Sequence, residues 1–164
     1  MQVSKNTQVI VNKELPFTGS VALVERFCSI AQTMQRNQTF LIAGESGTGK
    51  TLLAKFICQH SPSYNKKTRI VRLDEIPDDL LEKELFGHNG FEGRIKAADE
   101  GTLILKDVAH LPWHLQAQFL RLLEENEFEC LGEAATVKMN LRTVFVTSEN
   151  LFQAALENRF RQDL

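Results

Sequence analysis

The feature that most constrains the fold is a glycine-rich loop at residues 44–51, which read Gly-Glu-Ser-Gly-Thr-Gly-Lys-Thr. These residues fit the pattern G-x-x-x-x-G-K-[ST], which surrounds phosphates between a strand and a helix. Residues 39–43, before the loop, are continuously apolar, as in a strand buried on both faces. From Lys50 to about His60 the apolar residues recur at helical spacing. A strand, this loop and a helix in that order predict an α/β fold.

The chemistry of a phosphate site explains the fixed positions of this loop. Gly44 and Gly49 permit backbone angles and a close approach that a Cβ atom would block, so that amide groups and the positive end of the helix face the phosphates. Lys50 would reach the β and γ phosphates, and the Thr51 hydroxyl would ligate Mg²⁺. We predict nucleotide binding, with ATP as the default, by Gly44, Glu45, Ser46, Gly47, Thr48, Gly49, Lys50 and Thr51. The alternative is a glycine turn that binds nothing.

The rest of the chain alternates between strand and helix patterns. Further strands are predicted at 69–73, 102–108 and 141–147, and helices at 21–34, 78–86 and 115–125. Such alternation favours a mainly parallel sheet covered by helices on both faces, a three-layer α/β architecture. We expect a flexible N-terminal segment over residues 1–14 and one nucleotide-binding core over 15–164.

The composition excludes several classes of protein. The net charge of −2 gives the domain no electrostatic footprint for nucleic acid, so we expect no direct DNA binding. No apolar run approaches the roughly 18 residues that span a bilayer, and the N-terminus lacks a secretory signal. The three cysteines show no C-x-x-C spacing, so we assign them neither a disulfide nor a metal. We expect a cytoplasmic protein without a membrane segment.

Beyond the loop, the sequence resembles the AAA+ domain of bacterial sigma-54-dependent transcription activators, also called enhancer-binding proteins. Residues 44–50 match that family's G-E-S-G-T-G-K, and 82–88 are similar to its E-S-E-L-F-G-H. Further matches lie at residues 101–105, 111–124 and 160–164. The likeness covers about residues 15–164 in consistent order. It implies the ATP-binding core of a transcription regulator, with an adenine pocket lined by Phe17, Thr18 and Gly19.

The sequence departs from this family at the end of the Walker B strand. Lys106 and Asp107 occupy the places of an Asp-Glu pair whose Asp helps to hold Mg²⁺ and whose Glu orients the attacking water. A lysine about 5 Å from Mg²⁺ would repel it by roughly 6–7 kcal/mol at an effective dielectric of 20. Three alternatives remain open. Lys106 turns to solvent beside a working site, Asp107 takes over the metal, or Lys106 pairs with the γ-phosphate and favours tight binding without turnover.

Other positions implied by the resemblance also differ. Arg72 replaces an asparagine thought to restrain the catalytic Glu, and Ser148 replaces the asparagine of the Thr-Asn sensor. Arg161 falls on the first arginine finger, which would act on the ATP of a neighbouring subunit; the alternative is an ordinary surface arginine. The candidate catalytic residues are therefore Asp107, Arg161 and Ser148. Thr51 and Asp107 are the candidate metal ligands.

The chain is also short at two places where the family is long. Only residues 89–92 stand where family members carry a loop with G-A-F-T-G-A that touches the sigma factor. Four residues fit a tight turn and cannot present that loop. The sequence given ends at Leu164, before the helical lid of the family, so we expect a core without a lid. An excised portion of a longer regulator and a naturally short protein both fit this end.

Three functional hypotheses follow. The first is a regulatory module in which ATP binding promotes assembly into a homo-oligomer and hydrolysis is weak or absent, with RNA polymerase or other regulator domains as partners. The second is an oligomeric ATPase that uses Asp107 to orient water and Arg161 in trans. The third is an interaction domain whose loop binds no nucleotide.

Overall fold

A computed structural model describes residues 7–11, 39–60, 67–88, 90–130 and 136–164 of the chain. The helix predicted at 21–34 and the adenine-pocket candidates Phe17, Thr18 and Gly19 lie outside these residues. The described strands form a five-stranded parallel sheet in the order β1-β2-β7-β4-β3 and a small antiparallel pair, β5 and β6. The strands are β1 Thr7–Val11, β2 Thr39–Ala43, β3 Thr68–Arg72, β4 Thr102–Lys106, β5 Glu127–Glu129, β6 Thr136–Lys138 and β7 Arg142–Thr147.

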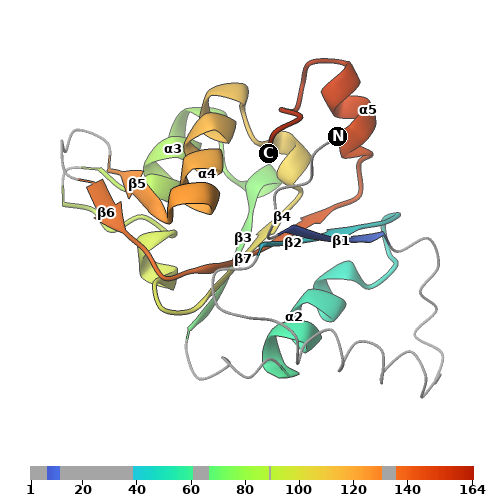
Figure 1. The fold of residues 1–164 in the computed structure, drawn as a ribbon, viewed down its shortest axis with the longest axis horizontal. Coiled ribbons are helices and arrows are strands. Elements are labelled where there is room, and N and C mark those ends of the chain that lie inside the picture. The colour runs from blue at the N-terminus through green and yellow to red at the C-terminus, as the bar shows by residue number, and fades with distance from the viewer. Residues whose placement is uncertain (1–6, 12–38, 61–66, 89, 131–135) are drawn as a thin grey trace.

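Helices cover both faces of the sheet, with α2 on one side and α3 and α4 on the other (Figure 1). The α-helices are α2 Lys50–His60, α3 Asp78–Phe86, α4 Trp113–Glu125 and α5 Leu151–Leu156. Short 3₁₀ turns lie at Leu73–Glu75, Lys96–Ala98 and Val108–His110. No helix in the described ranges is long and apolar enough to span a membrane. The predicted three-layer α/β fold with a parallel sheet is confirmed.

The alternation of side chains along the strands divides the core into two parts. Ile104 of β4 packs toward α2, whereas its neighbours Leu103 and Leu105 pack toward α3 and α4. Because successive residues of a strand point to opposite faces and both faces are covered, the interiors of central strands such as β2 and β4 are apolar. This is why residues 39–43 read as a continuous apolar run. The α2-side core consists of Phe40, Ile42, Leu53, Ala54, Ile57, Cys58, Ile104, Val144 and Val146.

The N-terminal segment differs from the sequence-based expectation. Residues 1–14 were expected to be flexible, but Thr7–Val11 forms the edge strand β1 and pairs in parallel with β2, from Thr7 opposite Thr39 to Val11 opposite Ala43. Three consecutive β-branched residues, 9–11, favour the extended backbone. The expectation failed because so short a run gains its stability from pairing with a neighbouring strand.

Smaller differences concern the ends of elements. The strand predicted over 102–108 ends at Lys106 because Asp107 adopts a left-handed backbone conformation, with φ of 58°. Helix α4 begins at Trp113, directly after Pro112, two residues before the predicted start. The pair β5–β6 and helix α5 were not predicted. Each of these elements has six residues or fewer, too few to show a clear period.

A tight turn follows α3 in the place expected for the four-residue connection. The backbones of His88 and Phe91 exchange hydrogen bonds of 3.2 and 2.8 Å. At the base of the turn, Gly87 and Gly93 bring their backbones so close that a Cβ on Gly93 would lie 2.4 Å from the Gly87 nitrogen. The Phe91 side chain is exposed, and its ring centroid lies 5.6 Å from that of His88. The turn therefore closes on itself, and two glycines permit this closure.

Candidate nucleotide site

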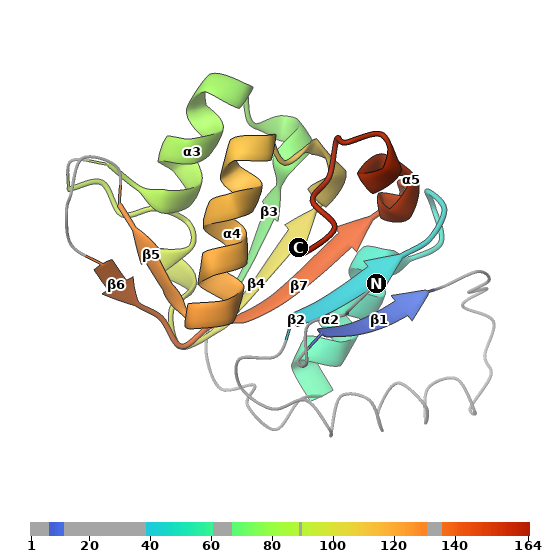
Figure 2. The same ribbon diagram turned by 45° about the horizontal axis from the view of Figure 1, so that its top comes forward.

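The strand register brings the candidate site residues to one edge of the sheet. Ala43 pairs with Thr147, Val146 pairs with Lys106, and Lys106 pairs with Arg72. All these strands run in the same direction, so their carboxyl ends meet at this edge (Figure 2). In parallel α/β sheets, ligands bind just beyond the carboxyl ends of the strands. The loop after β2 and the residues after β4 and β7 therefore surround a single region.

The glycine loop turns the chain from β2 into α2. Gly47 and Gly49 have positive φ angles of 82° and 80°, which explains why glycine stands at both positions. The sequence predicts special backbone angles at Gly44 and Gly49, whereas the structure has them at Gly47 and Gly49. The Gly44 amide instead donates a hydrogen bond of 3.2 Å to the Thr147 carbonyl of β7, which anchors the start of the loop. Within the loop, the Thr48 hydroxyl donates to the Glu45 carbonyl at 2.8 Å.

Lys50 folds back over the loop that precedes it. Its side chain is 9% exposed, and its Nζ donates to the Glu45 carbonyl at 2.6 Å. Burial lowers the pKa of Lys50, while Asp107 raises this pKa and Lys106 lowers it further. The ammonium is thus held at the loop, where it could exchange a carbonyl partner for a phosphate oxygen. Thr51, half-buried, follows it in the first turn of α2.

Lys106 ends β4 and Asp107 follows it, at the same edge of the sheet as Lys50 at the start of α2. Lys106 is half-buried and shares its face of β4 with Ile104, which belongs to the α2-side core. Asp107 follows in the left-handed conformation, and its amide donates a hydrogen bond of 2.8 Å to the Val146 carbonyl. Both charges act on the pKa of Lys50, so both lie within electrostatic range of its ammonium. The two residues that replace the expected Asp-Glu pair therefore lie at the edge of the sheet that carries the loop.

Arg72, at the end of the neighbouring strand β3, is held by acidic residues of the turn that follows it. Its guanidinium lies 3.1 Å from the Asp74 carboxylate and 2.6 Å from that of Glu75. The hydrogen bond to Asp74 is the largest cause that raises the pKa of Arg72, and Asp107 raises it as well. Arg72 is thus a third cation at this edge, with Lys50 and Lys106. Its charge is paired with two carboxylates in exposed ion pairs.

The sensor position follows β7. The Thr147 side chain is fully buried, and its hydroxyl accepts a hydrogen bond of 3.0 Å from the Glu149 amide. Ser148 is exposed. The structure therefore places Ser148 at the carboxyl edge with the loop, with its side chain open to solvent.

Arg161 lies near the C-terminal end of the chain and is held by two neighbours. Its guanidinium binds the Asp163 carboxylate through two hydrogen bonds of 2.9 and 2.7 Å. Its guanidinium carbon lies 5.8 Å from the centroid of the Trp113 ring, within the range of a cation–π contact. Hydrogen bonding to Asp163 raises the pKa of Arg161, which stays charged at any physiological pH.

Gln116 fixes this segment and was missed by the sequence analysis. Its side chain is fully buried in α4; its Nε2 donates to the carbonyls of Leu111 and Arg159 at 2.7 and 3.0 Å. Its Oε1 accepts a hydrogen bond of 2.7 Å from the Arg161 amide. A signal was present in the sequence, because position 116 falls on the apolar stripe of the helix formed by Leu115, Phe119 and Leu122.

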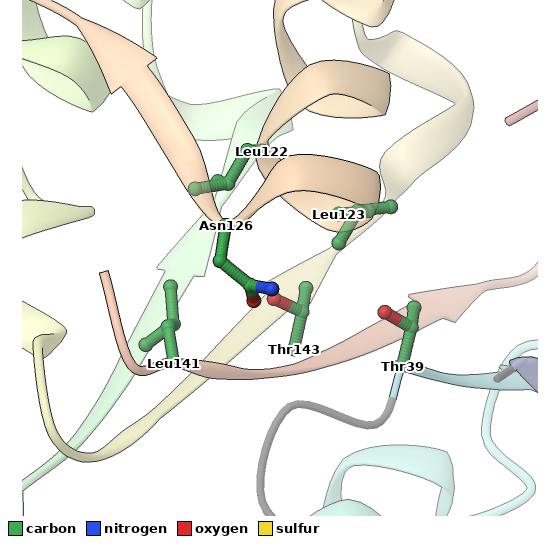
Figure 3. Close-up of a pocket in the computed structure, with 6 residues that line it drawn as sticks. All are labelled: Thr39, Leu122, Leu123, Asn126, Leu141 and Thr143. Atoms are coloured by element: carbon green, nitrogen blue, oxygen red, sulfur yellow. The ribbon is translucent and has the colours of Figure 1, made fainter. Parts of the chain in front are cut away.

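A small hollow at the opposite edge of the sheet is separate from this site (Figure 3). Thr39, the first residue of β2, and Thr143, near the start of β7, mark its position at the amino ends of the strands. The hollow is lined by Thr39, Leu122, Leu123, Asn126, Leu141 and Thr143. None of these residues belongs to the phosphate loop.

With this geometry in place, the family can be identified. Residues 17–164 match the sigma-54 interaction domain family. The chain belongs to this family. Among its curated relatives, the Nif-specific regulatory protein of Azorhizobium caulinodans is 40% identical over 156 residues, which cover 89% of this chain and 25% of that protein. The regulator NtrC of Escherichia coli K12 is 37% identical over 87% of this chain and 32% of its own length.

Solved structures agree with this assignment. NtrX from Brucella abortus in complex with ATP has a TM-score of 0.81 and 33% identity, and the match covers 92% of this chain and 34% of NtrX. The ADP complex of NtrX gives the same TM-score at 32% identity. A P-loop NTPase domain of an E. coli sigma-54 activator, 18% identical with a TM-score of 0.56, shares the fold. This sigma-54 interaction domain spans about a fifth to a third of the length of the curated relatives it matches.

Proposed function

We propose that this sigma-54 interaction domain binds ATP at residues 44–51, that it hydrolyses ATP weakly or not at all, and that binding controls its assembly within a transcription regulator. The observation that carries the proposal is the charge pattern around the loop. Lys50 lies over a loop of the right conformation for phosphates, while a lysine and a single carboxylate stand at the end of β4. The ATP complex of the relative NtrX supports the choice of nucleotide.

The conformation of the loop supports the proposal that it binds phosphates. Gly47 has a positive φ angle, and a Cβ added there would meet no atom within 4 Å, so the space beside Gly47 is open. Helix α2 begins at Lys50 and directs its positive end at the same place. Gly44, Glu45, Ser46, Gly47, Thr48, Gly49, Lys50 and Thr51 would hold the phosphates.

The proposal of assembly is supported by Arg161 and by the exposed apolar residues of α5. Arg161 follows α5 and is charged and partly exposed, as a residue that serves a neighbouring subunit would be. Phe152 and Leu156 are each 57% exposed and lie four residues apart, on one face of α5. Apolar side chains that share an exposed face favour contact with another protein surface. Another copy of the domain is the proposed partner.

The tight turn after α3 bears on the choice of partner. Gly87 and Gly93 close a turn in the place where the resemblance implies a long loop that touches the sigma factor. We therefore propose that the domain is a divergent member without that loop and that it acts on other regulator domains or on RNA polymerase by another surface.

The experiment measures ATP binding and phosphate release on the same purified chain. We expect ATP to raise the unfolding temperature, with little phosphate release over many turnovers. Lys50→Ala should abolish the thermal shift because it removes the buried ammonium. Lys55→Ala is the matched control, since Lys55 lies on the same helix and is exposed. Absence of any shift at millimolar ATP would refute nucleotide binding and leave an interaction domain.

The second candidate is an active oligomeric ATPase. Asp107 favours it, because this carboxylate acts on Lys50 and lies at the carboxyl edge where a water-orienting acid is needed. Phosphate release over many turnovers, lost in both Asp107→Asn and Arg161→Ala, would establish this candidate in place of the first. Size-exclusion chromatography with and without ATP tests assembly in either case.

A further inference from the structure

We infer that this domain binds nucleoside triphosphates without a divalent metal ion, because Lys106 supplies at the phosphates the positive charge that Mg²⁺ supplies in other P-loop proteins. The inference rests on the proposed function, since it concerns how the same loop holds its ligand. It goes further, because weak hydrolysis by itself says nothing about whether a metal takes part in binding.

The first observation is the position of Lys106 in the sheet. It is the last residue of β4 and pairs with Val146 on one side and Arg72 on the other. Ile104, two residues before Lys106 on β4, and Val146, its partner on β7, point to the same face of the sheet as Lys106. Both are buried against α2. Lys106 therefore continues the α2 face to the carboxyl edge, on the side where α2 begins.

The second observation is electrostatic. Lys50 begins α2 and Lys106 ends β4 on the face that α2 covers, so both charged residues lie at the same end of the α2 side of the sheet. Two like charges at this end of the sheet repel each other unless an anion lies near both, and Lys50 is a buried residue there. Asp107 provides one negative charge. A triphosphate, with several negative charges, would satisfy both lysines.

The residues present do not fit Mg²⁺. This ion takes oxygen ligands, and in P-loop proteins it uses the loop hydroxyl and a carboxylate at the end of the Walker B strand. The Thr51 hydroxyl is in place, but the strand-end position holds an ammonium, which has no lone pair to donate. Asp107 is one residue further, in a left-handed turn, and its charge is already opposed by Lys50.

The net charges explain how binding survives without the metal. A carboxylate with a bound Mg²⁺ presents one net positive charge to the phosphates, and a lysine at the same position also presents one. The substitution therefore preserves the attraction for the triphosphate and removes the need for a cation from solution. A metal ion brought beside Lys106 would instead be repelled.

The experiment compares ATP affinity in excess EDTA and in excess MgCl₂ by isothermal titration calorimetry on the 164-residue chain. For the unchanged chain we expect the two dissociation constants to agree within about threefold. For Lys106→Asp, which restores the carboxylate, we expect an affinity about 100-fold weaker in EDTA and largely recovered in MgCl₂. Lys106→Met keeps the length of the side chain without its charge, and we expect weaker binding that MgCl₂ does not rescue.

Lys96→Asp is the control, because it makes the same change in net charge at an exposed position of a 3₁₀ turn away from the loop. It should leave both constants unchanged. Tighter binding by tenfold or more in MgCl₂ for the unchanged chain would overturn the inference and leave the proposed function standing. Metal-independent binding that persists in both Lys106 variants would overturn the role of Lys106. Binding in neither condition would instead refute the proposed function itself.

Discussion

Replacing Gln116 with leucine tests how the C-terminal segment is held. Leucine has a similar volume and suits the apolar face of α4, so the main loss is that of three hydrogen bonds, to Leu111, Arg159 and Arg161. A hydrogen bond contributes about 1 kcal/mol net, and a buried group left unpaired costs about 1–3 kcal/mol. The bond to Leu111 is fully buried, whereas water can partly replace the two at Arg159 and Arg161. We therefore expect Gln116→Leu to lower the free energy of unfolding by roughly 2–3 kcal/mol.

Urea unfolding followed by circular dichroism measures this loss. The matched control is Gln118→Leu, two residues further along α4, where the side chain donates a 2.8 Å hydrogen bond to Glu82. We expect the control to cost about 1 kcal/mol or less. Hydrogen exchange provides a local readout, since the Arg161 amide loses its acceptor in Gln116→Leu and should exchange faster. Equal stability losses in the two variants, or an unchanged exchange rate at Arg161, would refute the anchoring role of Gln116.

Two further predictions concern buried groups. Gly93→Ala should lower the free energy of unfolding in urea by at least about 2 kcal/mol, because its Cβ would lie 2.4 Å from the Gly87 nitrogen. Gly90→Ala is the control at an open position with φ of 83°, and it should lower this free energy by only about 1 kcal/mol. Equal losses in the two variants would contradict the packing argument. Burial raises the pKa of the Cys58 thiol to about 11 despite the opposing charge of Arg142. At pH 9 the Cys58 thiol ionises in the unfolded chain and stays protonated in the folded chain. A thiol reagent at this pH should therefore modify Cys58 far more slowly in the folded chain than in urea. Equal rates would contradict the burial of this side chain.

The sequence predicted the parts of the fold that repeat a local pattern. Residues 39–43, Lys50–His60 and Asp78–Phe86 were located from periodicity, because a strand buried on both faces and an amphipathic helix each leave a clear pattern of apolar residues. The glycine loop could be placed for the same reason, since its residue types follow from the chemistry of phosphate binding.

Elements stabilised by distant partners could not be predicted in this way. The strand β1 is defined by its pairing with β2, and the role of Gln116 depends on Arg161, 45 residues away. The sequence identified Lys106 as a departure from the family pattern, but only the register of β4 with β3 and β7 shows which face it occupies. Long-range relations of this kind leave no periodic signal in the chain.

The pairing of Arg161 with Asp163 has a consequence for any contact between copies of this domain. The Arg161 guanidinium donates two hydrogen bonds to the Asp163 carboxylate, so its planar group is already oriented to bind an anion in the absence of a neighbouring subunit. Binding a phosphate on another copy would replace the Asp163 carboxylate by a second anion, so the desolvation cost for Arg161 would be small. Asp163 would thus occupy the place of the phosphate when no second copy is bound. The binding of Arg161 to a phosphate would then be easily reversed.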